Sequence, residues 1–523
     1  MRASGILFPV SSIPSRYGIG SFSREAYKFV DQLESAGQSY WQILPLGPTG
    51  YGDSPYQSFS TFAGNPYLID LEDLIEKGLL MESECSGCDW GGSESYVDYE
   101  KMYQSRFLVL KKAFSRFDPT DAAFLTFKNE NAEWLDDYCT YMAIKNDLGG
   151  ILWTEWPEEL KNREKQALKE AKERLFEERE FYAFQQFFFD TQWTKLKAYA
   201  NEKGIQIIGD VPIYVAFDSA DTWADPELFQ FDETHQPKSV AGCPPDAFSV
   251  TGQLWGNPVY DWKYHKKTNY AWWIRRMENA MKRYNVARID HFRGFEAYYA
   301  IPYGDKTAEN GKWEKGPGAE LFHVLKKKIP DLQVIAEDLG VITDEVREMM
   351  AETGFPGMKV LQFAFDESEA SVYLPYRFES SNCVVYTGTH DNETTKGWLE
   401  GLEKQQGHGI KFVREYINCY QQPVNDCVWA LIRTAMSSTA DLAIIPLQDY
   451  LCLGNEARIN EPSTLGNNWK WRLTKGLLSD TTLYHIREIT RIYGRNEMEN
   501  AFLKQKWEEK QKKEKKEKGE EDK

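Results

Sequence analysis

Residues 284–294 read YNVARIDHFRG, a short apolar stretch followed at once by Arg288, Asp290, His291 and Arg293. The apolar part is typical of a strand in a protein core, but a buried strand does not tolerate unpaired charges, because desolvating them is strongly unfavourable. The charges therefore indicate the place where the strand leaves the core. Arg288 and Asp290 are two positions apart, so on a strand their side chains face the same way.

Seven further short apolar runs have the same character and end in polar residues, glycine or proline. They cover residues 5–10, 40–46, 205–215, 332–340, 358–365, 384–391 and 442–450. Apolar runs bounded by turn residues fit strands that are buried on both faces, as in a parallel sheet. Amphipathic helical patterns, such as 23–37 and 343–354, separate several of the runs. Eight strands with intervening helices predict an α/β fold, the (β/α)₈ TIM barrel.

The spacing of the runs is uneven and predicts two large insertions, after the second and third strands. About 160 residues separate the second run from the third, and about 75 separate the third from the fourth, whereas a βαβ unit needs roughly 30. We therefore expect a single catalytic barrel over residues 1–502. One insertion, mostly helical, should cover about 72–200, and a second, made of a cleft-covering loop and helices, about 216–283. Residues 503–523 form a charged tail.

The composition narrows the class of partner. A net charge of −18 over 523 residues argues against nucleic acid and anionic membranes as partners. No apolar run approaches the roughly 18 residues of a membrane span, and the amino-terminal run is too short for a signal peptide, so we expect a cytoplasmic protein. Aromatic residues make up 14% of the chain, and Trp and Tyr rings suit the C–H faces of sugars. Cys85 and Cys88 form half of a zinc motif without a second half, which favours reduced thiols.

Acidic residues stand at the carboxyl ends of four predicted strands. They are Asp210, Asp290, Glu337 and Asp391. Active sites of TIM barrels lie at this end of the strands, so the four side chains should converge on one mouth. Each of them alone could be a helix N-cap or a surface group. Their joint occurrence on separate strands favours a functional site.

Asp290 and Glu337 have sequence neighbours that should push their pKa values apart. Arg288 should lower the pKa of Asp290 and keep it ionised, whereas burial and the adjacent Asp338 should raise the pKa of Glu337. Cleavage of a glycosidic bond requires such a pair, a nucleophile and a proton donor. The alternative is that Arg288 and Asp290 form a structural ion pair, since such pairs also perturb pKa values.

His390 precedes Asp391, and a ring nitrogen beside a carboxylate can bind adjacent hydroxyls of a glucose ring. A histidine at a strand end could equally be a core residue, because neutral imidazole serves both roles. Competing chemistries lack their residues: the chain contains no HExxH, no GxxxxGK[ST] and no GxSxG.

Longer motifs extend the pattern over nearly the whole chain except the tail. They are SGILFPVSSIPSRYGIG from residue 4, YWQILPLGPTGYGDSPYQS from 40, GDVPIYVAFDSADTWADPELF from 209, GCPPDAFSVTGQLWGNPVYDW from 242, ARIDHFRGF from 287, AEDLG from 336, GTHDNETTKGW from 388 and LGNEARINEPSTLGNNWKWR from 453. In these motifs the sequence resembles the 4-α-glucanotransferases, or amylomaltases, which are relatives of the α-amylases.

The resemblance implies an activity and a set of roles. Asp290 would be the nucleophile that forms a covalent glycosyl-enzyme, Glu337 the acid and then the base, and Asp391 the carboxylate that binds the 2- and 3-hydroxyls of the sugar. Further residues would bind substrate or support it: Arg288, His390, Asp210, Tyr56, Asp246, Phe248 and Trp255. The enzyme would move α-1,4-glucan segments between maltodextrins, without metal or cofactor, as a monomer or homodimer.

Two other interpretations remain open at this stage. An α-glucan hydrolase would share the same residues, and would differ in whether water reaches the covalent intermediate. A carbohydrate-binding protein without catalysis would not require Asp290, Glu337 and Asp391 together, because binding needs neither an acid nor a nucleophile.

Overall fold

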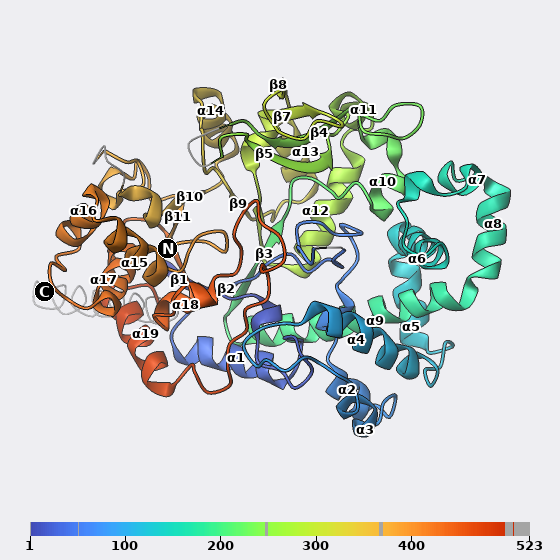
Figure 1. Ribbon diagram of the computed structural model, residues 1–523, viewed down its shortest axis with the longest axis horizontal. Coiled ribbons are helices and arrows are strands. Elements are labelled where there is room, and N and C mark those ends of the chain that lie inside the picture. The colour runs from blue at the N-terminus through green and yellow to red at the C-terminus, as the bar shows by residue number, and fades with distance from the viewer. Residues whose placement is uncertain (1, 51, 246–248, 366–369, 497–505, 507–523) are drawn as a thin grey trace, which may run out of the picture.

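The computed structural model describes residues 2–50, 52–245, 249–365, 370–496 and 506, and the eight predicted strands form one parallel sheet in chain order (Figure 1). They are β1 (Ala3–Leu7), β2 (Tyr40–Gln42), β3 (Gln206–Val211), β6 (Val286–Ile289), β9 (Val334–Ala336), β10 (Gly357–Val360), β11 (Cys383–Tyr386) and β12 (Leu442–Pro446). The sheet closes where the N–H of Ala336 donates to the carbonyl of Pro356 at 2.9 Å. The predicted TIM barrel is confirmed.

Helices follow or precede the barrel strands and cover the outside of the sheet. They are α1 (Arg24–Ser35), α12 (Ala271–Arg283), α13 (Ala319–Lys328), α14 (Asp344–Thr353), α15 (Thr395–Gln405), α16 (His408–Tyr416), α17 (Val424–Ser437), α18 (Leu447–Tyr450) and α19 (Asp480–Ile492). Amphipathic helices such as α1 bury one face only: Ala26, Phe29, Val30 and Leu33 point to the barrel core. This alternation of strand and helix is what the sequence patterns predicted.

The segment between β2 and β3 is mostly helical and forms a lobe on one side of the barrel (Figure 1, right). Its helices are α2 (Leu71–Glu76), α3 (Glu82–Ser86), α4 (Tyr99–Phe114), α5 (Ala122–Glu130), α6 (Ala132–Asp147), α7 (Glu158–Lys161), α8 (Lys165–Arg174) and α9 (Phe176–Glu202). Helix α9 runs back to β3 and packs against α1 and α12 as well as α4, α5 and α6. One long helix therefore joins the lobe to the barrel.

A second sheet, which the sequence analysis did not expect, lies over the barrel mouth (Figure 1, top). Its four antiparallel strands are β4 (Ser239–Cys243), β5 (Gln253–Pro258), β7 (Ala297–Pro302) and β8 (Lys312–Lys315), and the short helices α10 (Ala220–Ala224) and α11 (Trp262–Lys267) flank the first two. The cleft-covering loop expected within about 216–283 is thus partly the antiparallel pair of β4 and β5. The pairing of β4 with β7, which follows the next barrel strand, could not be predicted from the local sequence.

Alternation along the strands decides which residues enter the barrel. An apolar layer fills its interior, made by Leu7, Leu44, Ile208, Ile335, Met358, Val360, Val384, Tyr386 and Ile444. Side chains two positions apart share a face, so Asp210 follows Ile208 and Glu337 follows Ile335 into the layer above. Arg288 stands opposite Asp210 in the register of β3 and β6. The charged residues therefore sit on an apolar floor at the carboxyl end of the barrel.

Among the described residues, none of the helices has the length and apolar character needed to cross a membrane.

Candidate active site

A cleft of about 1020 Å³ opens at the carboxyl ends of the barrel strands and gathers most of the predicted site residues. Those that line it are Tyr56, Trp255, Asp290, Glu337, His390 and Asp391. Asp210 and Arg288 lie beneath them and are almost fully buried. The two remaining predicted residues, Asp246 and Phe248, lie outside the described residues.

Arg288 is the cation at the base of this cleft. Its Nη1 lies 2.8 and 2.7 Å from the two carboxylate oxygens of Asp210, and 3.0 Å from Oδ1 of Asp290. The side chains of Arg288 and Asp210 are 3% and 0% exposed, so water does not screen their attraction. Asp210 thereby fixes the guanidinium that meets Asp290.

Burial raises the pKa of Asp290 to about 6, although Arg288 acts to lower it. The neighbouring Arg288 predicted a lowered pKa for Asp290, and the net direction is the reverse. Two facts explain the error: burial disfavours the charged form, and Arg288 is shared with Asp210, whose own charge also raises the pKa of Asp290. The carboxyl is nevertheless ionised near neutral pH.

Glu337 keeps its proton to a higher pH than Asp290 does. Its Oε2 accepts the N–H of His291 and its Oε1 the N–H of Leu339, each at 2.7 Å. Burial, followed by the negative charge of Asp290, raises the pKa of Glu337 to about 7, against Arg288 and the two N–H groups. This direction agrees with the expectation from sequence. His291 is in the left-handed conformation, with φ 49°, directly after the end of β6.

A chain of hydrogen bonds and ion-pair contacts joins this centre to Asp391. The Tyr56 hydroxyl donates to Oδ2 of Asp210 at 2.8 Å and lies 2.9 Å from Nε2 of His390. The same Nε2 is 3.3 Å from Oδ2 of Asp391, and the Tyr56 and His390 rings stack. With Arg288 at its other end, the network runs without a break between Asp290 and Asp391. His390 is therefore a polar member of the site, beyond its part in the core.

Sequence reasoning missed two residues of the site, Asn460 and Arg458. Asn460 Nδ2 donates to Oδ1 of Asp391 at 2.6 Å, and Arg458 Nη2 donates to the Asp391 carbonyl at 3.0 Å. Both stand in the NEARINEP motif, in a loop beyond α18 rather than at a strand end. Strand-end reasoning could not place them, and the polar, proline-bounded motif was the available signal.

The hairpin of β4 and β5 covers part of the cleft. The Trp255 ring meets the His291 ring edge to face, with centroids 4.8 Å apart. Gln57 Nε2 donates to Oδ1 of Asn257 at 3.0 Å, and Asn257 Nδ2 to the carbonyl of Val215 at 2.8 Å. These contacts hold the hairpin close to the residue that follows Asp290.

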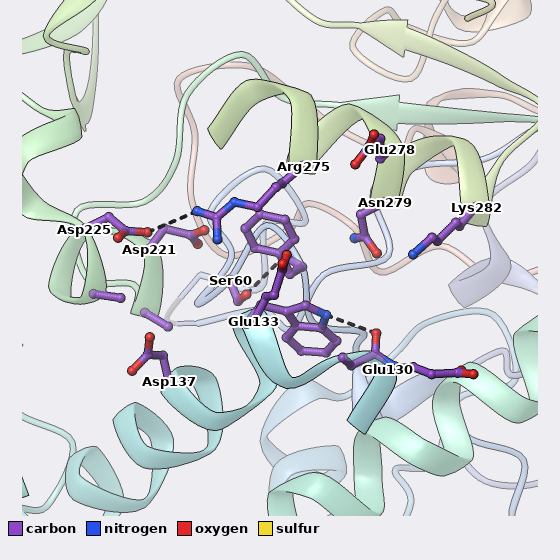
Figure 2. A pocket seen from close by; sticks show the side chains of 15 residues that line it. Ser60, Glu130, Glu133, Asp137, Asp221, Asp225, Arg275, Glu278, Asn279 and Lys282 are labelled. Carbon is purple, nitrogen blue, oxygen red and sulfur yellow. Dashed lines mark hydrogen bonds and ion pairs between the residues drawn. The ribbon is translucent and has the colours of Figure 1, made fainter. Parts of the chain in front are cut away.

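A smaller hollow lies apart from this cleft, where α6 and α12 face each other (Figure 2). It measures about 90 Å³, below the roughly 300 Å³ at which ligand pockets begin. Arg275 points across it to Asp225, and the two form an ion pair at 3.6 Å. The hollow does not reach the strand ends, so the larger cleft is the candidate active site.

The arrangement can perform acid and nucleophilic chemistry on an uncharged substrate. It offers a carboxyl that holds a proton, a carboxylate beside a guanidinium, and a third carboxylate with an adjacent imidazole. Across the ranges that the structure describes, His, Cys, Asp and Glu side chains do not gather in groups of three or more that could hold a metal ion.

Comparison with known proteins gives consistent matches over nearly the whole chain. A family model described as 4-alpha-glucanotransferase matches residues 8–479. The 4-alpha-glucanotransferase of Clostridium butyricum is 49% identical over 93% of this chain and 100% of its own length. That of Thermus thermophilus is 47% identical over 91% of this chain and 96% of its own.

Solved structures agree with the sequence matches. The amylomaltase of Streptococcus agalactiae, solved in complex with acarbose, superposes with a TM-score of 0.91 at 41% identity, and covers 95% of this chain and 100% of its own. The amylomaltase of Corynebacterium glutamicum shares the fold with a TM-score of 0.74 at 18% identity, over 94% of this chain and 75% of its own.

Proposed function

The chain belongs to the 4-alpha-glucanotransferase family, and we propose that it transfers α-1,4-glucan segments by two successive displacements at one anomeric carbon. The observation that carries this proposal is the pair at the barrel mouth, Glu337 with a raised pKa beside Asp290 and its guanidinium partner. A retaining glycosidic cleavage requires one carboxyl that donates a proton and a second that is ionised and attacks.

In the first displacement, an oxygen of Asp290 attacks the anomeric carbon of the donor glucan. The bond from that carbon to the leaving glucan oxygen breaks, and the proton of Glu337 passes to this oxygen. The product is an ester between the sugar and Asp290, with Glu337 left ionised. Arg288 stabilises the carboxylate before attack, and again when the ester breaks.

In the second displacement, Glu337 takes the proton of the acceptor's 4-hydroxyl, and the acceptor oxygen attacks the same carbon. The ester bond to Asp290 breaks, and both carboxyls return to their starting states. Two inversions at one carbon restore the α configuration.

Asp391, with His390, would bind the 2- and 3-hydroxyls of the sugar at the reacting position. Both line the cleft, and Asp391 is the more exposed of the two. The cover formed by Trp255 and its hairpin would limit the access of water to the ester, so that a second glucan reacts instead. Maltodextrins would therefore be both donor and acceptor.

A matched pair of variants tests the division of roles. Asp290→Asn is expected to lose at least about 10³-fold in rate with both maltotriose and α-maltosyl fluoride, because both need the nucleophile. Glu337→Gln should lose activity with maltotriose but still release fluoride from α-maltosyl fluoride in the first turnover, since fluoride departs without a proton. A first-turnover release of fluoride that is slowed as much as the reaction with maltotriose would contradict the proposed acid.

A product analysis tests transfer and stereochemistry. Wild-type protein with maltotriose should yield glucose together with chains longer than the substrate, all α-linked by proton NMR. Shorter sugars alone would indicate a hydrolase, and β-linked first products would exclude the double displacement.

A further inference from the structure

Asp391 is held from two sides, and only one of them comes from its own strand end. His390 Nε2 lies 3.3 Å from Oδ2, and Asn460 Nδ2 donates to Oδ1 at 2.6 Å. A carboxylate with a partner on each oxygen has one orientation, which a single partner does not ensure. The partner from the loop is an amide, so it adds a hydrogen bond without adding a charge.

Asn460 is itself fixed by the main chain. Its N–H donates to the carbonyl of His390 at 3.1 Å, and its own carbonyl accepts from Arg458 Nε at 2.8 Å. Arg458 Nη2 also donates to the carbonyl of Asp391 at 3.0 Å. Two of these contacts join the segment 458–460 to residues 390 and 391 and the third braces the segment itself. None of them involves the Asn460 side chain, so all three would persist in a side-chain variant.

We infer that Asn460 is a positioning residue for Asp391: its amide sets the direction in which that carboxylate meets the hydroxyls of the bound glucan. The inference rests on the proposed substrate-binding role of Asp391. Asn460 is 9% exposed and lines the cleft beside Asp391, so its amide has few alternative partners. A carboxylate free to rotate would lose part of the orientation that speeds the reaction.

Several charged or titratable groups face Asp391 from the elements around it. His390 comes from the same turn, Tyr56 from the loop after β2, Asp290 from the end of β6, and Arg458 from the opposite loop. Asn460 also contacts Asp391, and its amide does not titrate. A carboxyl at its position would stand at hydrogen-bond distance from another carboxyl, and two such groups share a proton over part of the pH range.

The first experiment compares Asn460→Asp with Asn467→Asp. Asn467 is exposed in the same loop and does not line the cleft, so its variant adds the same charge without touching Asp391. kcat and KM for maltotriose are measured from pH 5 to 9, with the thermal midpoint as a check of the fold. Asn460→Asp is expected to move the acidic limb of the kcat profile upward by about one pH unit. Asn467→Asp should follow the wild-type profile.

The second experiment removes the amide without adding charge. Asn460→Ala should lower kcat about 10- to 100-fold, the range for a hydrogen bond to a charged group, with a smaller change in KM. Asn460→Gln, which retains the amide on a longer stem, should recover part of the loss. Profiles of Asn460→Ala and Asn460→Asp that superimpose on wild type, or an equal shift in Asn467→Asp, would overturn the inference.

Asp391→Asn separates this inference from the proposed function. If Asp391→Asn is inactive while Asn460→Ala and Asn460→Asp behave as wild type, the positioning role is wrong and the role of Asp391 stands. If Asp391→Asn retains wild-type turnover, the role of Asp391 itself is wrong, and the inference falls with it.

Discussion

A single residue, Arg288, compensates the negative charges of two carboxylates in the site. One guanidinium faces two carboxylates, Asp210 at 2.7 Å and Asp290 at 3.0 Å, and its own side chain is almost fully buried. Removing the cation would leave buried negative charge uncompensated, which typically costs about 3–5 kcal/mol. The residue therefore supports both the fold and the ionisation of Asp290.

Arg288→Lys tests this dual contact. A lysine retains the charge but has a single terminal nitrogen, which cannot reproduce the geometry of the guanidinium toward both partners. Asp290 should then ionise at higher pH, so the acidic limb of the kcat/KM profile with maltotriose should move upward, with a fall of at least about 10-fold at pH 6. An unchanged limb would show that Asp290 does not depend on Arg288.

The raised pKa of Glu337 predicts a loss of activity at alkaline pH. Its raised pKa of about 7 means that the proposed acid loses its proton as the pH rises through that value. The kcat/KM for maltotriose should therefore fall above about pH 7, whereas the consumption of α-maltosyl fluoride should not show this limb. The same limb with both donors would assign it to another group.

The raised pKa of Glu337 also predicts that the stability difference between the wild type and Glu337→Gln depends on pH. Between its ordinary pKa of 4.5 and about 7, the folded protein holds a proton that the unfolded chain has released, so rising pH destabilises the fold. Glu337→Gln removes this effect. The thermal midpoint of Glu337→Gln, measured relative to that of the wild type, should be higher at pH 8 than at pH 5. The same difference between the two proteins at both pH values would contradict the raised pKa.

The sequence correctly predicted side-chain directions where the two-residue period of a strand determines them. The period of two puts Arg288 and Asp290 on one face, and the structure brings them into contact. The direction of the Asp290 pKa was wrong, because the depth of burial depends on the whole mouth. Asn460 was missed because its loop meets Asp391 from 69 positions away in the sequence.

Elements were predictable where their signal is local. The eight barrel strands are continuous apolar runs, which burial on both faces requires, and all eight were found. The second sheet has no such signal: β8 reads KWEK and is exposed throughout, and β4 pairs with β7 more than 50 residues later. Its strands are stabilised by tertiary pairing rather than by their own sequence.

Gly209 is required by the packing of β3 against Tyr284. A Cβ at this position would lie 2.2 Å from the Tyr284 ring, which is itself buried. Gly209→Ala should therefore destabilise the protein by about 1–3 kcal/mol, measured by urea unfolding, and reduce activity because Asp210 is the next residue. Gly401→Ala in α15, where no atom lies within 4 Å of the new Cβ, should be neutral or stabilising. Equal effects of the two would refute this packing argument.

At the scale of the whole molecule, we propose that the lobe and the barrel form one cooperative unit. Helix α9 packs against α1 and α12 of the barrel and against α4, α5 and α6 of the lobe, and Trp193 Nε1 donates to the carbonyl of Arg283 at 3.0 Å. Calorimetry should show a single unfolding transition that coincides with the loss of activity. Two separate transitions would indicate that the lobe folds independently.

In the proposed reaction, Asp290 carries the sugar between donor and acceptor. The most direct measurement is mass spectrometry of Glu337→Gln after incubation with α-maltosyl fluoride without acceptor, because this variant should form the ester but release it slowly. We expect an added maltosyl mass on the peptide that contains Asp290. An adduct on another carboxylate, or fluoride release with no adduct and an inverted product, would contradict it.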